Sequence, residues 1–481
     1  MKNFLPCSKP VPVLEKIRSV FSPEEVFSFF SSRDKAVFLN SSMESDAARY
    51  SFIGLDPFFS LESKGSLINI ALHGQKLRMF GNPLKVLKSA ASSYNVRNKT
   101  QFPLISGGMG YFSYEVKNLI EDLAPLREDD IDIPEIWFNF YRCILIFDKR
   151  CPGEFYASVL DLDPGGGMKA GQIIDEIKDT LSRRSGNYSG GLADPEEKLE
   201  NPGKSGAGII SNFTKEEYVK AVEKTLGHIK DGDIYQACLS QRFSTIWETS
   251  GYGLYLKLNK VNPSPFGAYI NGGDFSIISS SPELFLRRRD NVIETRPMKG
   301  TRPAGSSCDE DAGIKAELEQ SAKDKAELLM IVDLERNDLG KIAVPGSVRI
   351  EEPRRIERHP TVFQAISIIK GNVEEGTDNL DILEAAFPGG SITGCPKIRA
   401  MNIISDIEPC IRGVYTGSIG YLSFHGTMDM NIAIRTMTLK EGNLYFHAGG
   451  GIVSDSDPEE EYEETLVKAR ALMDACGANP D

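Results

Sequence analysis

The chain has 481 residues, 41% of them hydrophobic, which is enough to form one large domain or two ordinary domains with buried cores. Its formal charge of −13, from 55 Lys and Arg against 68 Asp and Glu, offers no basic surface to nucleic acid or anionic lipid. Binding of an anionic substrate must therefore depend on particular local groups.

Several familiar features are absent from the sequence. The eight cysteines are scattered, without Cys-x-x-Cys pairs or zinc-type clusters, which indicates reduced thiols rather than disulfides. No phosphate-loop, dinucleotide-binding or Gly-x-Ser-x-Gly motif is present, which argues against an NTPase, a Rossmann dehydrogenase and an α/β-hydrolase. No signal-peptide core or bilayer-length apolar run is found, so we expect a cytoplasmic protein.

Composition predicts three regions along the chain. Residues 1–182 mix strand-like runs, such as Cys143 to Asp148, with helical segments such as Ile173 to Ser182, which is typical of an α+β region. Residues 183–211 are rich in Gly, Ser, Pro and charge, so they are predicted to form a flexible linker. We expect residues 212–478 to form a second domain.

The predicted second domain, residues 212–478, opens with a helix followed by a strand. Thr214 and Glu217 have the spacing of a capping box at a helix start. In the strand, Gln236 and Tyr235 lie on opposite faces, because successive side chains of a strand alternate. We expect Gln236 on a polar surface that flanks a sheet.

Lys299 lies in the segment ETRPMKGTRP, where a strand runs into a turn marked by Pro297 and Gly300. Such a turn on a rigid scaffold can present a side chain to a ligand, and an amine held there could attack carbon. The alternative for any single lysine is a solvated side chain beside a turn.

Residues 317–334 have the length and composition of a helix. The helical pattern predicts one apolar face made of Leu318, Ala322, Leu329 and Val332. The opposite face carries Asp324, Glu327, Ile331 and Leu334, so we expect Glu327 to be buried as well. From helix geometry alone, an ion pair with a lysine such as Lys323 and a metal or ligand role explain Glu327 equally well.

Three strand-like runs near the C-terminal end predict an antiparallel meander. They are GVYTGSIGYLSF (413–424), MNIAIRTMTL (430–439) and LYFHAGGGIV (444–453). In the second run, Arg435 shares a strand face with Asn431 and Ala433.

A final helix is predicted to begin at Asp457, which is followed by a proline at the first helical position. Its predicted buried stripe is Tyr462, Leu466, Ala469, Met473 and Cys476. Glu461, Glu464 and Lys468 form a different stripe, which taken alone is a solvated face. Carboxylates from two separate helices would nevertheless suit Mg²⁺, a hard cation that prefers oxygen ligands.

Taken together, eight ordered motifs resemble the chorismate-utilising enzymes and span residues 212–476. They are GDIYQACLSQRF (232–243), SSSPELFL (279–286), ETRPMKGTRP (294–303), SAKDKAELLMIVDLERNDLG (321–340), FPGGSITGCPKIRAM (387–401), VYTGSIGYLSF (414–424), IAIRT (432–436) and GGGIVSDSDPEEEYEETLVKA (449–469). Residues 1–182 resemble the N-terminal region of the aminating members of that family. The resemblance implies an α+β fold of two large antiparallel β-sheets packed together and flanked by helices, with residues 212–478 as the chorismate-binding catalytic domain.

The resemblance also implies a metal and substrate site. Mg²⁺ would be held by Glu327 and Glu464, with Glu461 and Asp324 around them, and would neutralise the ring carboxylate of chorismate. The remaining positions implied to contact the substrate are Tyr415, Arg435, Gly449, Gly451, Lys468, Thr301, Ser391 and His359.

Three further positions are implied to be catalytic. Glu283, in the Ser-Pro-Glu motif, would be the acid that protonates the departing 4-hydroxyl; alone, it would pass for a surface carboxylate. Gln236 replaces the lysine base of members that add water, and an amide cannot deprotonate water, so ammonia is the expected nucleophile. Lys299 replaces the alanine of ortho-aminating members and implies para amination through a transient lysine adduct.

The resemblance implies partners as well. No Gly-x-Cys-x-Gly elbow surrounds any cysteine, so ammonia would come from a separate glutamine amidotransferase subunit. The segment SSMES (41–45) partly resembles a tryptophan site of related enzymes. Ortho amination and a non-catalytic binding subunit remain as alternatives, although the intact set of Glu283, Lys299, Glu327 and Glu464 speaks against the second.

Overall fold

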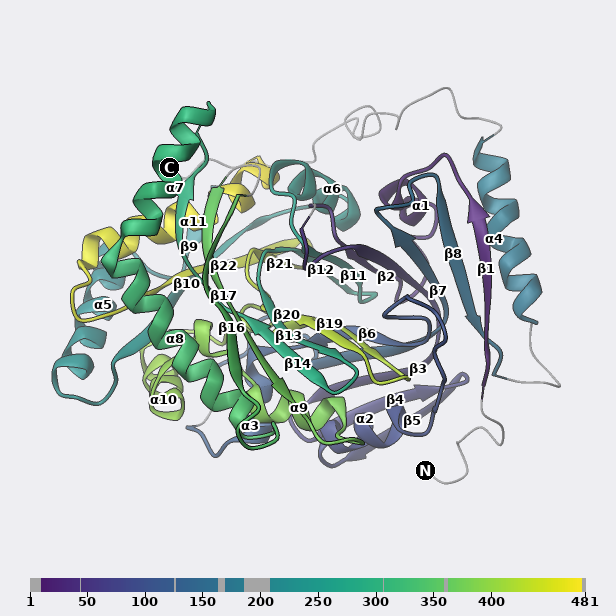
Figure 1. Ribbon diagram of the computed structural model, residues 1–481, viewed down its shortest axis with the longest axis horizontal. Helices are drawn as coiled ribbons and strands as arrows, with labels where there is room; N and C mark the ends of the chain where they lie inside the picture. The colour runs from purple at the N-terminus through teal and green to yellow at the C-terminus, as the bar shows by residue number, and fades with distance from the viewer. Residues whose placement is uncertain are drawn as a thin grey trace.

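The computed structural model describes residues 10–43, 45–124, 127–162, 169–185, 208–305, 307–358 and 362–477. These residues contain 22 strands, linked by antiparallel ladders into one hydrogen-bonded network, with helices packed around it (Figure 1). The predicted α+β class is confirmed. None of the helices described is long and apolar enough to cross a membrane.

A long two-stranded ribbon is shared by the two sheets of the fold. It consists of β3 (Tyr50–Lys64) and β7 (Ile136–Asp148), which pair along almost their whole length. The register shifts between Pro57 and Phe59, and proline, which has no N–H to donate, is tolerated in strands at such irregular points. One half of the ribbon belongs to the first sheet and the other half to the second.

The first sheet extends from the half of the ribbon that contains Tyr50. In order of pairing, its other strands on one side are β2 (Val37–Asn40), β11 (Phe266–Asn271), β12 (Phe275–Ser281), β21 (Thr436–Lys440), β22 (Asn443–Ile452) and β10 (Gln236–Ile246). The short strands β9 (Ile210–Ser211) and β18 (Gly394–Cys395) pair with β10. On the other side lie β8 (Glu154–Leu160) and β1 (Pro12–Arg18).

The second sheet extends from the half of the ribbon that contains Lys64. On one side lie β4 (Leu67–Leu72) and β5 (Gln75–Phe80). On the other side, in order of pairing, are β6 (Gly107–Phe112), β19 (Ser418–Ser423), β20 (Met428–Asn431), β13 (Leu284–Arg289), β14 (Val292–Arg296) and β17 (Val362–Asn372). Both β15 (Met298–Pro303) and β16 (Arg349–Arg358) pair with β17.

Helices cover the outer faces of this network. They are α1 (Pro23–Ser28), α2 (Pro83–Ala91), α3 (Lys117–Ile120), α4 (Ala170–Ser185), α5 (Lys215–Lys230), α6 (Gly251–Val261), α7 (Cys308–Gln320), α8 (Ala322–Gly340), α9 (Asn379–Ala386), α10 (Lys397–Ile407) and α11 (Pro458–Cys476). In Figure 1, α8 runs along β16 and β17, while α4 lies beside β1 at the opposite end of the molecule.

Adjacent residues of the first sheet enter two different hydrophobic cores. On β12, Ile277 packs in the core between the sheets, together with Leu286 of the second sheet. Its neighbour Ile278 packs in the outer core with Phe27 of α1 and Leu472 of α11. Because successive side chains point to opposite faces, a strand covered on both sides is apolar at consecutive positions.

Residues 1–182 and residues 212–478, predicted as separate regions, contribute strands to the same sheets. β2 pairs with β11 in the first sheet, and β6 pairs with β19 in the second. Within the predicted linker, α4 continues to Ser185 and β9 begins at Ile210, while residues 186–207 lie outside the described residues. The division of the chain into residues 1–182, 183–211 and 212–478 stays a prediction.

The prediction of one helix over residues 317–334 is wrong. The chain breaks at Ser321, whose hydroxyl accepts the backbone N–H of Asp324 at 3.2 Å and so begins α8. Leu329 is 59% exposed, and the buried stripe of α8 consists of Leu328, Ile331, Val332, Glu335, Asp338 and Leu339. The pattern of apolar residues does not predict this stripe, because two of its buried residues, Glu335 and Asp338, are acidic.

The predicted meander is also wrong. β20 and β21 belong to different sheets, and the chain crosses between them over residues 432–435. Arg435 lies in this crossing with φ of +51°, so it does not share a strand face with Asn431.

The two predicted helix starts are confirmed. Thr214 and Glu217 form a reciprocal capping box, and the Asp457 carboxylate accepts two backbone N–H groups of the first turn of α11. Glu461, however, lies on the buried stripe of α11 with Thr465 and Ala469, apart from the exposed Glu464.

A pair of leucines tests the placement of the core between the sheets. Leu61 of β3 is 0% exposed, whereas Leu77 of β5 is 46% exposed. Leu61→Ala is expected to lower the free energy of unfolding by about 2–5 kcal/mol, because it removes buried methyl groups and leaves a cavity. Leu77→Ala should cost less than about 1 kcal/mol. Urea denaturation measures both, and equal losses would contradict this placement.

Candidate functional site

Lys299 is a partly buried residue of β15. Its Nζ lies 3.5 Å from Oε2 of Glu327 on α8, and its side chain is 18% exposed. The register of β15 on β17 shifts between Lys299 and Thr301, around Gly300, which has φ of +77°. Glycine adopts this conformation without steric cost, so the turn residue helps to aim the lysine.

Gln236 and Lys299 meet over the backbone of Gly451 on β22. A Cβ at Gly451 would lie 2.8 Å from Nζ of Lys299 and 3.1 Å from Nε2 of Gln236. Gln236 is buried and its Oε1 has no hydrogen-bond partner among the described residues, whereas Tyr235 is 71% exposed. The expectation of Gln236 on a surface is therefore wrong, because its side chain lies against the backbone of Gly451, next to Lys299.

Glu283 is a buried carboxyl between β12 and β13. Its Oε1 accepts a hydrogen bond of 2.6 Å from the hydroxyl of Ser391, in the 3₁₀ turn Gly390–Ile392. Burial raises the pKa of Glu283 to about 8, against the opposing effects of the Ser391 hydroxyl and the Lys299 charge. At neutral pH this carboxyl is protonated and can act as an acid.

The first turns of α11 supply two more carboxylates. The Oε1 of Glu461 accepts a hydrogen bond of 2.6 Å from Ser456, while its Oε2 is buried and has no partner in the part of the chain that the structure describes. Burial raises the pKa of Glu461, and the nearby charge of Glu464 adds to this effect. Burial also acts to raise the pKa of Glu464, but the ammonium of Lys468, 2.5 Å away, more than offsets it.

These carboxylates have the chemistry of a Mg²⁺ site. A Cβ at Gly450 would lie 2.7 Å from Oε2 of Glu461 and 3.6 Å from Oε1 of Glu464, so both groups face one space. The unpartnered oxygen of Glu461 is the kind of ligand that a hard cation takes. Glu327 is instead paired with Lys299, and the described residues contain no cluster of three or more side chains in metal-binding positions. The donor types fit Mg²⁺, and its binding stays a prediction.

Most of the residues implied by the resemblance gather around Lys299. Its charge acts on Glu283, Glu461 and Glu464 in addition to its pairing with Glu327. The ammonium of Lys468 donates to the carbonyl oxygen of Gly449 at 2.9 Å, beside Gly450 and Gly451.

The remaining predicted residues make contacts elsewhere. Tyr415 is buried and stacks on His447 at 4.9 Å, and the Nη1 of Arg435 donates to Oδ1 of Asn262 at 3.1 Å. Thr301 is exposed on β15, and His359 lies outside the described residues. Asp324 pairs with Arg302 at 3.0 Å, next to Gly300.

The sequence did not single out Glu335, which belongs to the same region. Its Oε1 accepts the backbone N–H of Gly390 at 2.8 Å, and burial raises its pKa to about 7. The signal that could have found it is an acidic residue at the spacing of the buried stripe of α8, four positions after Ile331.

A family model described as chorismate binding enzyme matches residues 42–474. The chain belongs to the chorismate-binding enzyme family. Two relatives are each 36% identical: anthranilate synthase component 1 of Acetivibrio thermocellus, over 97% of this chain and 95% of the relative, and aminodeoxychorismate synthase component 1 of Bacillus subtilis (strain 168), over 92% of each.

A solved structure of the family has the same fold. The crystal structure of anthranilate synthase component I from Streptococcus pneumoniae TIGR4 superposes with a TM-score of 0.76 at 29% identity, and covers 95% of this chain and 98% of that chain. The predicted family and fold are therefore confirmed, including the antiparallel sheets flanked by helices.

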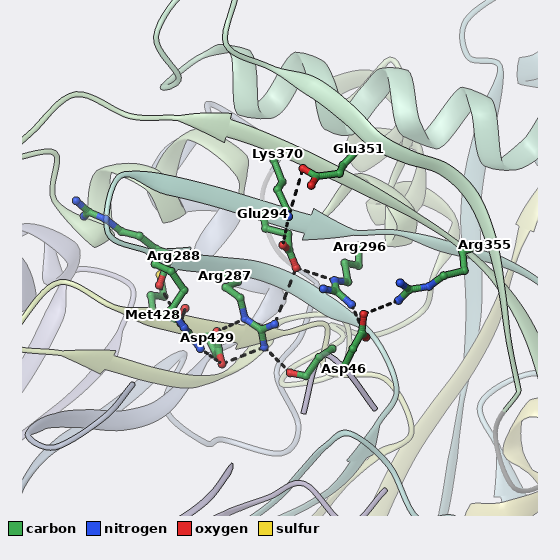
Figure 2. A network of polar contacts seen from close by, with 12 residues as sticks. Asp46, Arg287, Arg288, Glu294, Arg296, Glu351, Arg355, Lys370, Met428 and Asp429 are labelled. Carbon is green, nitrogen blue, oxygen red and sulfur yellow. Dashed lines mark hydrogen bonds and ion pairs between the residues drawn. The ribbon is translucent and has the colours of Figure 1, made fainter. Parts of the chain in front are cut away.

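A cavity of about 250 Å³ lies between the sheets, and Lys299 is not among its lining residues. Ser41, Asp46, Arg287 and Asp429 help to line it, and Glu44 of the SSMES segment lies outside the described residues. Figure 2 shows ion pairs that lead from this cavity through Glu294 towards the strands that precede Lys299. Binding of tryptophan there stays a prediction.

The close approach at Gly451 gives a test of the site geometry. Gly451→Ala is expected to leave the thermal unfolding midpoint nearly unchanged, because the crowded atoms are the ends of flexible side chains. Chorismate consumption should fall about tenfold or more, since Lys299 and Gln236 must move. Gly171→Ala on α4, where nothing lies within 4 Å of the added Cβ, is the matched control. Full activity of Gly451→Ala would contradict the site.

Proposed function

We propose that this chain aminates chorismate at C4 to give 4-amino-4-deoxychorismate, on the route to 4-aminobenzoate and folate. The observation that carries this proposal is the position of Lys299, whose amine lies over Gly451 beside Gln236. The acid Glu283 and the carboxylates of α8 and α11 surround it. A relative named aminodeoxychorismate synthase component 1 supports the same choice.

The proposed reaction proceeds through a bond between Lys299 and the substrate ring. The neutral amine adds to C2, and the 4-hydroxyl departs as water with the proton of Glu283. Ammonia then bonds to C4 as the bond between C2 and Nζ breaks, which frees Lys299, and the new C4 ammonium gives up a proton that restores Glu283. The net change exchanges a hydroxyl for an amine, releases one water and keeps the nitrogen para to the ring carboxylate.

Gln236 makes ammonia rather than water the expected nucleophile. Its amide is not a base and cannot activate water. Its buried Oε1, which lacks a partner among the described residues, is an acceptor that an N–H of ammonia can use. Ammonia would come from a separate glutamine amidotransferase subunit, in agreement with relatives whose names contain component 1.

Mg²⁺ would be held by Glu461 and Glu464, with Glu327 as a further ligand after it leaves Lys299. When bound, the ion neutralises the ring carboxylate of chorismate. Lys468 would orient a substrate carboxylate from its place between Glu464 and the carbonyl of Gly449.

The second candidate is ortho amination with release of pyruvate, the reaction of anthranilate synthases. Several relatives of 34–37% identity carry that name, which favours it. This reaction needs no lysine at position 299, because direct attack of ammonia at C2 places the nitrogen ortho.

Product identity decides between the two. With chorismate, Mg²⁺ and ammonium, the parent chain should give 4-amino-4-deoxychorismate by mass spectrometry, and no fluorescent anthranilate. Lys299→Ala should lower formation of the para product more than about a thousandfold, because the adduct cannot form. Lys325→Ala, an exposed lysine of α8, is the control and should retain activity. Anthranilate from the parent, or para product from Lys299→Ala at full rate, would refute the assignment.

Metal removal tests the second part of the proposal. Chelation should abolish chorismate consumption, and added Mg²⁺ should restore it. Calorimetric titration of Mg²⁺ into the metal-free protein should show binding that Glu461→Gln weakens about tenfold or more. Glu463→Gln, with a side chain 59% exposed on the same helix, should bind normally. Identical binding by Glu461→Gln would exclude that residue as a ligand.

A further inference from the structure

Glu335 is a buried carboxylate of α8 that contacts two separate parts of the site. Its exposure is 2%, and it lies on the stripe that α8 packs against β17 and the 3₁₀ turn. The Oε1 atom accepts the N–H of Gly390 at 2.8 Å, and the Oε2 atom accepts the hydroxyl of Thr295 at 3.4 Å.

Each of these contacts leads to a reacting group. Gly390 directly precedes Ser391, whose hydroxyl donates to Glu283 at 2.6 Å. Thr295 lies on β14, four residues before Lys299, and its strand continues through Pro297 into β15. The carboxylate of Glu335 therefore links the turn that holds the acid to the strand that carries the nucleophile.

The turn fits closely around this carboxylate. A Cβ at Gly390 would lie 2.7 Å from Cδ2 of Leu334 and 3.0 Å from Oε1 of Glu335, so the backbone of the turn lies directly against α8. A buried carboxylate costs free energy unless it is well hydrogen-bonded, and an aliphatic side chain would fill this space without that cost. Its charge and its bonds therefore call for a role beyond packing.

We propose that Glu335 is a positioning residue that holds Ser391 against Glu283 and aligns the strand of Lys299, a role that rests on the proposed function. Glu335 itself touches none of the reacting atoms assigned to this site. It acts through Ser391, through Thr295 and through its charge.

The charges around the two carboxyls support this role. Glu283 is affected by Glu335, which raises its pKa, and by Lys299, which lowers it. At Glu335, burial raises the pKa, the neighbouring Asp338 adds to this effect and the ammonium of Lys397 opposes it. Burial is the main cause that raises the pKa of Glu283 to about 8, and the charge of Glu335, which ionises near pH 7, adds to it because it makes ionisation of Glu283 less favourable.

Replacement of the charge gives a direct test. In E335Q the amide oxygen can still accept the N–H of Gly390, but the negative charge is gone. Glu283 must be protonated to act, so kcat falls as the pH rises through the pKa of Glu283. Without the charge of Glu335 this pKa is lower, and the basic limb of the kcat profile should move to lower pH by about half a unit or more. The KM for chorismate should stay within about twofold, because Glu335 contacts no substrate.

Two further variants keep the test decisive. Asp333→Asn removes an exposed carboxylate of the same helix, 62% exposed at its side chain, and should leave the profile in place. Glu335→Asp keeps the charge, but its side chain is one methylene too short to reach Gly390. The basic limb of its kcat profile should therefore stay at the parent pH, while kcat itself falls about tenfold. If E335Q does not fold, Glu335→Asp alone decides, and an unchanged kcat would refute the role.

Chorismate consumption is followed for every variant, whichever isomer is formed. A folded E335Q with the parent profile would overturn the role of Glu335 while the parent remains active. If E335Q only loses thermal stability and the basic limb of its kcat profile does not move, Glu335 has a structural role and the proposed positioning role is overturned. A parent chain that consumes no chorismate would instead overturn the proposed function.

Discussion

The ammonium of Lys299 lies among carboxylates from three distant segments of the chain, and every group of the site is arranged around it. Glu327 pairs with it directly, and its charge reaches Glu283 and Glu464. The net charge of −13 would otherwise repel an anionic substrate. Local cations such as Lys299 and Lys468 therefore make binding of a dicarboxylate feasible in an acidic protein.

The crowding of side chains around Lys299 explains why glycine occurs at two positions of β22. Gly450 lies against Glu461, and Gly451 lies against both Lys299 and Gln236. A side chain at Gly451 would occupy the space beside the amine of Lys299 and the amide of Gln236. The backbone of β22 thus forms one wall of the site, and the side chains reach it from β10, β15 and α11.

Local chemistry allowed much of this to be predicted from sequence. The capping box at Thr214 and the helix start at Asp457 depend on neighbouring residues only, and the motif around Lys299 marks the candidate site without any knowledge of the fold. Tertiary contacts decided the rest. Gln236 is buried because its side chain lies against Gly451 of β22, a strand distant in the sequence, and the segment before Arg435 crosses between sheets instead of turning back. The stripe of α8 was misplaced because Glu335 and Asp338 are buried, which apolar patterns cannot indicate.

The shared ribbon of β3 and β7 has a consequence for how the chain can be divided. β11 needs β2 as a neighbour and β19 needs β6, and all of these strands attach to the ribbon. A fragment that began near residue 212 would carry every reacting group yet expose two unpaired strand edges, which invite aggregation. Residues 212–477 therefore hold the side chains of the candidate site but depend on the first part of the chain to complete both sheets.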